Sequence, residues 1–261
     1  MIRSSRHLLR HLALDILSLK GEISTGVHLL NGHYIGVNNL PDSIFASLLT
    51  QIKKEAQLIN FDEATKIIVT GKIPKKEKLV AFTFDDGFEE CFLKIRPVLK
   101  AEGIKAGFFI NTGFIDGNKD YKTNFLKTKV KLPTIKEPMT WEQIITLKSE
   151  GHIIGAHTID HDRLVGIDYN KLYHQIVGCK KRIEEKLEEP CNYFAYPYGQ
   201  LEDIVSEGRK LASQHFLYNF TQTNSKDYFS FKDYPFINRR HFEGNWKFNH
   251  VKYFLKRNLL K

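Results

Sequence analysis

Cysteine is scarce in this sequence, and long apolar runs, internal repeats and low-complexity tracts are missing. Only three cysteines, Cys91, Cys179 and Cys191, occur among 261 residues. Their odd number and wide spacing predict no disulfide framework and fit a reducing compartment, and no CxxC pair indicates a cysteine zinc site. No run approaches the ~18 apolar residues that cross a bilayer, so a membrane-spanning helix is not expected.

The first twenty residues mix three arginines with eight leucine and isoleucine residues. They lack the uninterrupted apolar stretch and the small-residue cleavage site of a signal peptide. The pattern predicts an amphipathic helix packed on the domain. The alternative is a basic helix that makes a peripheral contact with a membrane surface. We therefore expect a cytoplasmic protein, with membrane association as the alternative.

Positive charge exceeds negative charge, and the formal net charge is +9. Such an excess can indicate nucleic acid, an anionic membrane or an acidic polymer as the partner. Here the basic residues are spread along the chain without a DNA- or RNA-binding motif, so nucleic acid is not expected. We interpret the charge as a solvated surface, with attraction to anionic glycans or lipids as the alternative. Nothing in the sequence indicates an oligomeric state.

From about residue 79, short β-rich runs alternate with helical patterns, which predicts parallel strands joined by crossover helices. Strands are expected over residues 79–84, 105–110, 152–156, 192–196, 215–220 and 236–238. Helices are expected over residues 42–55, 89–101, 141–150, 168–189 and 246–260. Thr140 and Gln143 fit a capping box at the third of these helices. Residues 111–138 show no clear period and are expected to form an irregular insertion near a site.

The strongest local signal is an apolar strand that ends in Asp85 and Asp86, followed by Gly87. Successive strand residues point to opposite sides, so the chain must bend for both carboxylates to serve one site. Gly87 permits that bend. Carboxylates at this end of a parallel strand lie where α/β enzymes place catalytic groups, although a solvated turn has the same local pattern.

A second signal is the pair His157 and His161, just after another expected strand. Two imidazoles four residues apart can converge on one ion if the segment makes a helical turn. Asp160 and Asp162 could orient the rings as acceptors. The pair alone is weak evidence. Together with a carboxylate from the first signal, it supplies the ligand count of a catalytic zinc site with an open position.

A third signal is the aromatic strand end Phe-Ala-Tyr-Pro-Tyr-Gly at residues 194–199. Its simplest interpretation is a rigid loop with packed rings. The functional interpretation is a wall of a sugar pocket, formed by Tyr196, Pro197 and Tyr198, that presents a backbone N–H to a developing oxyanion.

These three segments, in this order, resemble the polysaccharide deacetylase family, whose members share the NodB homology domain. The family's opening motif Thr-Phe-Asp-Asp-Gly stands at residues 83–87, its histidine motif at residues 157–161, and its third motif at residues 194–199. The resemblance covers about residues 78–240. It implies an α/β fold, a distorted (β/α) barrel with about seven strands. We expect a catalytic domain over residues 78–261 and an extension packed on the barrel over residues 1–77.

The resemblance also implies the roles of the site residues. Asp86, His157 and His161 are expected to hold one divalent metal ion, usually zinc and sometimes cobalt or nickel. Asp85 is expected to be the general base. The backbone N–H of Tyr198 is expected to help bind the oxyanion.

Two departures from the family pattern concern the base and the acid. Many members carry arginine in the third motif to hold the base, where this chain has Ala195. The variant is similar to the subgroup that deacetylates poly-N-acetylglucosamine exopolysaccharides. Arg239 or Arg240 is expected to replace the missing guanidinium. For the general acid, His33 is favoured by similarity to that subgroup, with His241 as the alternative.

The resulting expectation is a metal-dependent hydrolase that removes an N-acetyl group from an amino sugar in a polysaccharide or glycan precursor. One alternative keeps the reaction centre but changes the substrate to a formylated or acylated amino sugar on a lipid, or to a non-sugar amide. Another is a carbohydrate-binding barrel without catalysis. Intact Asp85, Asp86, His157 and His161 argue against it, since a binding module needs neither a base nor an open metal.

Overall fold

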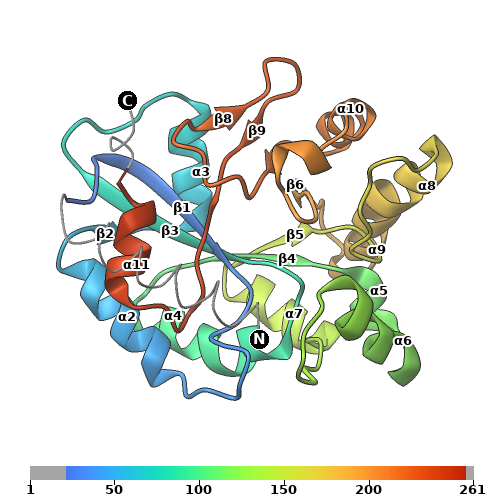
Figure 1. Cartoon of the computed structure of the whole chain (residues 1–261), viewed down its shortest axis with the longest axis horizontal. Coiled ribbons are helices and arrows are strands. Elements are labelled where there is room, and N and C mark those ends of the chain that lie inside the picture. Colours follow the sequence, from blue (N-terminus) through green and yellow to red (C-terminus); the bar gives the residue numbers. More distant parts are fainter. Residues whose placement is uncertain (1–21, 257–261) are drawn as a thin grey trace, which may run out of the picture.

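The structure, a computed structural model, describes residues 22–256 and is built around one curled sheet (Figure 1). Seven strand positions run parallel: β1 (Gly26–Gly32), β3 (Lys78–Phe84), β4 (Gly107–Ile110), β5 (Ile153–Ala156), β6 (Tyr193–Ala195), β7 (Tyr218–Phe220), and β9 (Phe236–Ile237) continuing into β10 (Arg240–His241). The short β2 (Gln57–Leu58) pairs with the first half of β3, and β8 (Phe229–Ser230) lies antiparallel to β9.

Residues 236–241 join the two ends of the sheet. β9 pairs with β7 where Ile237 lies opposite Phe220, and β10 pairs with β1 where Arg240 lies opposite Leu30. One run of chain thus bonds to both ends, so the sheet closes into a distorted barrel. The expected fold class is confirmed. β1, which lies in the segment expected as an extension, is itself a strand of this barrel.

Helices and helical turns cover the outside of the sheet and connect its strands (Figure 1). The α-helices are α2 (Ser43–Lys53), α3 (Phe61–Val69), α4 (Arg96–Ala101), α5 (Thr112–Asp116), α6 (Lys119–Asn124), α7 (Trp141–Ser149), α8 (Tyr169–Tyr173), α9 (Cys179–Leu187), α10 (Ser206–His215) and α11 (Phe248–Phe254). Three single π-turns, η1 (Cys91–Ile95), η2 (Phe125–Lys129) and η3 (His174–Gly178), and a 3₁₀ turn, η4 (Leu201–Asp203), interrupt or link them.

Helix α3 fills the end of the barrel where the strands begin. Its first residue, Phe61, packs on Phe109, Tyr193 and Phe220 inside the barrel, at ring-centroid distances of 5.3–6.0 Å. A Cβ on Gly107 would lie 2.7 Å from the Phe61 ring, so only glycine leaves room for it there. This apolar plug closes one end of the barrel and leaves the polar side chains at the other.

The local expectations met mixed outcomes. The capping box of Thr140 and Gln143 is present at α7, and Asp168 caps α8 through the N–H of Lys171. The expectation of an irregular insertion over residues 111–138 is wrong in its first half, which forms α5, α6 and η2, because helical propensity there acts without a long amphipathic period. Helix α3 was not expected at all.

Three further expectations concern cysteines and membranes. All three cysteines are buried and free. Between residues 22 and 256, no helix combines the length and apolar character that a bilayer crossing requires. The expected N-terminal helix, with its peripheral membrane contact, lies outside the described residues.

Candidate active site

The two adjacent carboxylates of the first motif reach one site because the backbone reverses its alternation after β3. Thr83 and Asp85 continue the row of side chains that faces the barrel interior. Asp86 then adopts φ +73° and Gly87 φ +81°. The bend therefore begins at Asp86 itself, one residue before the expected position. Left-handed backbone at a non-glycine residue is costly and is typical of functional sites.

The two histidines converge through a loop, and the expected helical turn is absent. Thr158 and His161 both have left-handed backbone, with φ +66° and +52°. The buried side-chain amide of Asn111 donates to the carbonyl oxygens of His157 and Thr158. Asn111 follows β4, so the neighbouring strand holds the histidine loop in shape.

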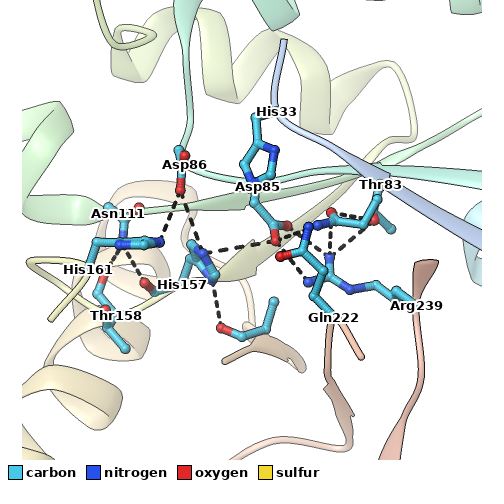
Figure 2. Close-up of polar contacts among 12 residues, drawn as sticks. His33, Thr83, Asp85, Asp86, Asn111, His157, Thr158, His161, Gln222 and Arg239 are labelled. Carbon is cyan, nitrogen blue, oxygen red and sulfur yellow. Dashed lines mark hydrogen bonds and ion pairs between the residues drawn. The ribbon is translucent and has the colours of Figure 1, made fainter. Parts of the chain in front are cut away.

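Asp86, His157 and His161 are all buried and bring three potential ligand atoms together (Figure 2). Asp86 Oδ1 lies 3.6 Å from Nε2 of His157 and 3.4 Å from Nε2 of His161. Tetrahedral donors bonded to zinc at ~2.0–2.1 Å lie roughly 3.4 Å apart. Asp86 Oδ1 has no hydrogen-bond partner among the described residues. These residues therefore fit a divalent metal ion.

Neighbouring groups put the imidazoles in the form that binds a cation. His157 Nδ1 lies 2.7 Å from the carbonyl oxygen of Ala195, so Nδ1 donates there, and Nε2 is the ring nitrogen that faces Asp86. Burial, with smaller contributions from His157 and His33, lowers the pKa of His161 well below its usual value. Burial raises the pKa of Asp86, against the effect of nearby histidines.

The second carboxylate, Asp85, is held by a buried network (Figure 2). Arg239 donates to both of its oxygens at 2.8 Å, and Asn31 Nδ2 donates to Oδ2 at 3.0 Å. The guanidinium also donates to Thr83 Oγ1 and lies 4.9 Å from the centroid of the Phe109 ring. Burial opposes the charge on Asp85, but Arg239, together with His157 and His33, outweighs burial and lowers the pKa of Asp85 to about 2. This carboxylate is ionised at neutral pH.

The two arginines that the sequence left as alternatives lie on opposite sides of the strand. Arg239 points into the barrel and is fully buried beneath Asp85. Arg240 points outward, where its guanidinium donates to the carbonyl oxygens of Phe254 and Ser225. Only Arg239 lies against the carboxylate in the structure.

His33 and His241 lie together at the top of the barrel, with Glu243 between them. Glu243 Oε1 is 3.6 Å from His33 Nδ1 and 3.2 Å from His241 Nε2. Burial opposes protonation of His33, but Glu243 and the nearby aspartates raise the pKa of His33 to about 9. In turn the two histidines, against burial, lower the pKa of Glu243 to about 2.

Residues of the third motif lie in two different environments. Tyr196 is buried in the core against Phe194 and Phe236, and Pro197 is buried beside it. Tyr198 instead lines the site: it has φ +61°, and its ring lies edge-on to His161 at 4.8 Å. Within the described part of the chain, the Tyr198 backbone N–H donates to no protein acceptor.

One cavity of about 280 Å³ gathers these groups. Its walls include the possible metal ligands Asp86, His157 and His161, together with His33 and Tyr198. His241 is not among the lining residues and lies behind Glu243. Lys129 and Lys131 also line the cavity.

Sequence reasoning missed several residues of the site and misplaced two. Asn31, Asn111, Gln222 and Glu243 were not predicted, although Asn31 shares the inward alternation of β1 with His33. The expectation that Asp160 and Asp162 orient the imidazoles is wrong, because other side chains engage both carboxylates. The partners are Tyr121 and Gln175 for Asp160, and Lys129 and Lys171 for Asp162.

Solved deacetylases share this fold. The Streptococcus pyogenes deacetylase PplD superposes with a TM-score of 0.68 at 18% identity, over 87% of this chain and 97% of that one. IcaB from Ammonifex degensii also reaches 0.68, at 22% identity, over 90% of this chain and 99% of that one. At such low identity the similarity concerns the fold, a distorted barrel of the deacetylase type.

The sequence model of the polysaccharide deacetylase family matches residues 72–216, more than half of the chain, so the protein belongs to this family. A peptidoglycan-N-acetylglucosamine deacetylase of Bacillus cereus is 30% identical over 145 residues, 55% of this chain and 57% of that protein. A second match of that description, also from Bacillus cereus, is 25% identical over 189 residues, 70% of this chain and 61% of that protein. The matches span between 50% and 61% of the curated relatives' own lengths.

Proposed function

We propose that the chain is a metal-dependent hydrolase that removes the N-acetyl group from an amino sugar in a polysaccharide or glycan precursor. The observation that carries the proposal is one pocket holding a buried three-ligand cluster beside an ionised carboxylate. A carbohydrate-binding barrel needs neither group. The names of the curated relatives support an N-acetylglucosamine substrate.

The cluster Asp86, His157 and His161 would hold the metal ion, with zinc the best match to two nitrogens and one oxygen, and cobalt or nickel as alternatives. Such an ion supplies positive charge that polarises the acyl carbonyl and acidifies a nearby water. Tyr198 contributes a further donor, because its free backbone N–H can bind the oxygen on which negative charge develops. A donor of this kind is worth about 3–4 kcal/mol of barrier.

Asp85 acts as the general base in this proposal and takes the proton of the attacking water. Arg239 is a positioning residue: it fixes the carboxylate plane through two hydrogen bonds and keeps it ionised. The arginine that many relatives carry in the third motif is replaced here from a different strand.

His33 acts as the general acid and protonates the leaving nitrogen, which otherwise departs as a poor anionic amide. It lines the pocket, whereas His241 does not, and its raised pKa keeps it protonated at neutral pH. Tyr196 and Pro197 support the wall from the core, so direct substrate contact falls to Tyr198 among the three.

The test is release of acetate from β-linked N-acetylglucosamine oligomers by protein that has been stripped with a chelator and then reloaded with zinc. Activity is expected only after reloading, and Asp85→Asn serves as the inactive control. Release of formate from a formylated amino sugar, without acetate release, would shift the substrate to the formyl class. If the protein binds the sugar but releases neither acetate nor formate, the result would favour a carbohydrate-binding barrel without catalysis.

A further inference from the structure

A second group of possible metal ligands lies beside the same cavity, which two of its three members, His33 and Glu243, line. His33, His241 and Glu243 offer two imidazole nitrogens and one carboxylate oxygen within 4.8 Å of one another. The distances from Glu243 Oε1 to the two rings, 3.6 and 3.2 Å, are close to the roughly 3.4 Å between tetrahedral zinc donors. Small side-chain shifts would therefore suffice to bind a cation.

The surroundings of this trio orient it as the neighbours of metal ligands do. Gln222 Nε2 lies 2.8 Å from His241 Nδ1, and a carboxamide can present its oxygen or its nitrogen to that atom. The carboxamide oxygen can thus accept a hydrogen bond from the Nδ1–H of His241 when Nε2 binds a cation. Glu243 Oε2 is buried and has no hydrogen-bond partner among the described residues. Trp246 packs edge-on against the His241 ring at 5.3 Å and limits its rotation.

A cation that enters the pocket meets both ligand sets. His33 and Glu243 line the cavity of about 280 Å³ together with Asp86, His157 and His161. Both carboxylate oxygens lie near two imidazoles, but Asp86 Oδ1 accepts no hydrogen bond from the described residues, whereas Glu243 Oε1 lies 3.2 Å from Nε2 of His241, within hydrogen-bond distance. A cation must replace these contacts in the second set, so that set is expected to bind more weakly and to fill last.

We propose that His33, His241 and Glu243 form a second site for a transition-metal dication, separate from the cluster of Asp86, His157 and His161, and that its occupation inhibits the enzyme. The inhibition rests on the proposed function, in which His33 is the acid. An imidazole whose Nδ1 holds a cation has lost the proton that makes it a strong donor. Two nitrogens and one oxygen favour zinc, nickel or copper over magnesium or calcium.

The first experiment counts zinc on the full chain by equilibrium dialysis and metal analysis, from zinc-free protein up to millimolar zinc chloride. The wild type is expected to bind two ions in distinct steps. His241→Gln and Glu243→Gln should each keep the first, tighter zinc ion. The affinity of each variant for the second ion should be at least tenfold weaker than that of the wild type. His215→Gln, a matched change on α10, should bind two. His157→Ala should keep the weaker step.

One bound zinc in the wild type over this range overturns the site, and so does an unchanged second step in both His241→Gln and Glu243→Gln. Circular dichroism verifies that each variant folds. If either His241→Gln or Glu243→Gln does not fold, the other variant alone decides the result. Magnesium chloride in place of zinc chloride should leave the second step unfilled, and filling by magnesium contradicts the ligand chemistry argued above.

The second experiment follows acetate release as zinc rises. The wild-type rate is expected to pass through a maximum and fall, while His241→Gln, whatever its own maximal rate, begins to fall at zinc concentrations at least tenfold higher. If two ions bind and the rate of acetate release never falls, the second site stands but the proposed inhibition is overturned. If two zinc ions bind but no acetate is released, the second metal site is supported. The proposed function, and the inhibition that rests on it, are then overturned.

Discussion

The guanidinium of Arg239 donates two hydrogen bonds of 2.8 Å to the carboxylate of Asp85, across 154 positions of sequence. Both groups are buried inside the barrel, where a lone charge would be costly. The pair thus links the last strand run to the first motif, and it determines the ionisation of the proposed base.

Arg239→Gln is expected to lower the free energy of unfolding by about 3–5 kcal/mol, because Asp85 would remain buried without its cation. The control is Arg182→Gln, which breaks partly exposed ion pairs with Asp116 and Glu185 and should cost no more than about 1 kcal/mol. Urea denaturation at neutral pH measures both. Equal, small losses would mean that the buried pair contributes little.

The same pair predicts a dependence of stability on pH. The pKa of Asp85 is lowered to about 2 from 3.8, so the pair stabilises the folded state above pH 3.8. This contribution is lost as pH falls towards 2. In Arg239→Gln the decline in stability over this window should be smaller than in the wild type. Parallel pH curves for the two proteins would contradict the assigned pKa shift.

Asp85→Asn is expected to reduce kcat by about 10²–10⁴-fold while zinc still binds, because the amide cannot accept the proton of the attacking water. His157→Ala should lose both turnover and tight zinc binding, since it removes a ligand. Acetate release and metal content of the purified variants distinguish the two roles. Wild-type turnover in Asp85→Asn would exclude it as the base.

His33 is expected to set the alkaline limit of activity. Its pKa is raised to about 9 from 6.5, so the protonated acid, and the stability from its pairing with Glu243, are fully present below pH 6.5 and are lost as pH rises through 9. Glu243→Gln should move the alkaline limb of kcat to lower pH, whereas Glu185→Gln on the exposed face of α9 should not. Full activity of His33→Gln would transfer the acid role to His241.

Asn111→Ala is expected to weaken zinc binding about 10–100-fold without touching a ligand, because Asn111 holds the loop that carries both histidines. Asn170→Ala on the exposed face of α8 is the matched control and should leave zinc affinity unchanged. Competition with a chromophoric chelator measures both affinities. The same affinity in Asn111→Ala would show that the left-handed loop keeps its shape unaided.

The residues of the site that could be predicted from the sequence are those within short motifs. Asp85, Asp86, His157 and His161 each lie at a strand end, and a local pattern suffices to place them. Arg239 and Arg240 could not be separated, because the choice depends on which of two adjacent side chains, in the run of chain that closes the barrel, points inward. Glu243 gave no signal at all, since its role depends on two histidines brought together by barrel closure.

The same limit applies to the fold. Strands with strong apolar character, such as β3 and β4, are visible in the sequence, and so is the capping box at α7. Helix α3 was missed although its buried residues, Phe61, Ala64, Thr65 and Ile68, recur at helical spacing, because a helix of nine residues gives this pattern only once. The bend at Asp86 could be expected in the region of Gly87, yet its exact residue depends on the tertiary contacts of both carboxylates.

Closure of the barrel by residues 236–241 has a consequence for biosynthesis. β1 leaves the ribosome early, but its partner β10, along with Arg239 and His241, emerges more than 200 positions later. Contacts so distant along the chain form slowly. The nascent protein therefore carries Asp85 without its counter-ion, and an open sheet edge, until residues 236–241 have left the ribosome.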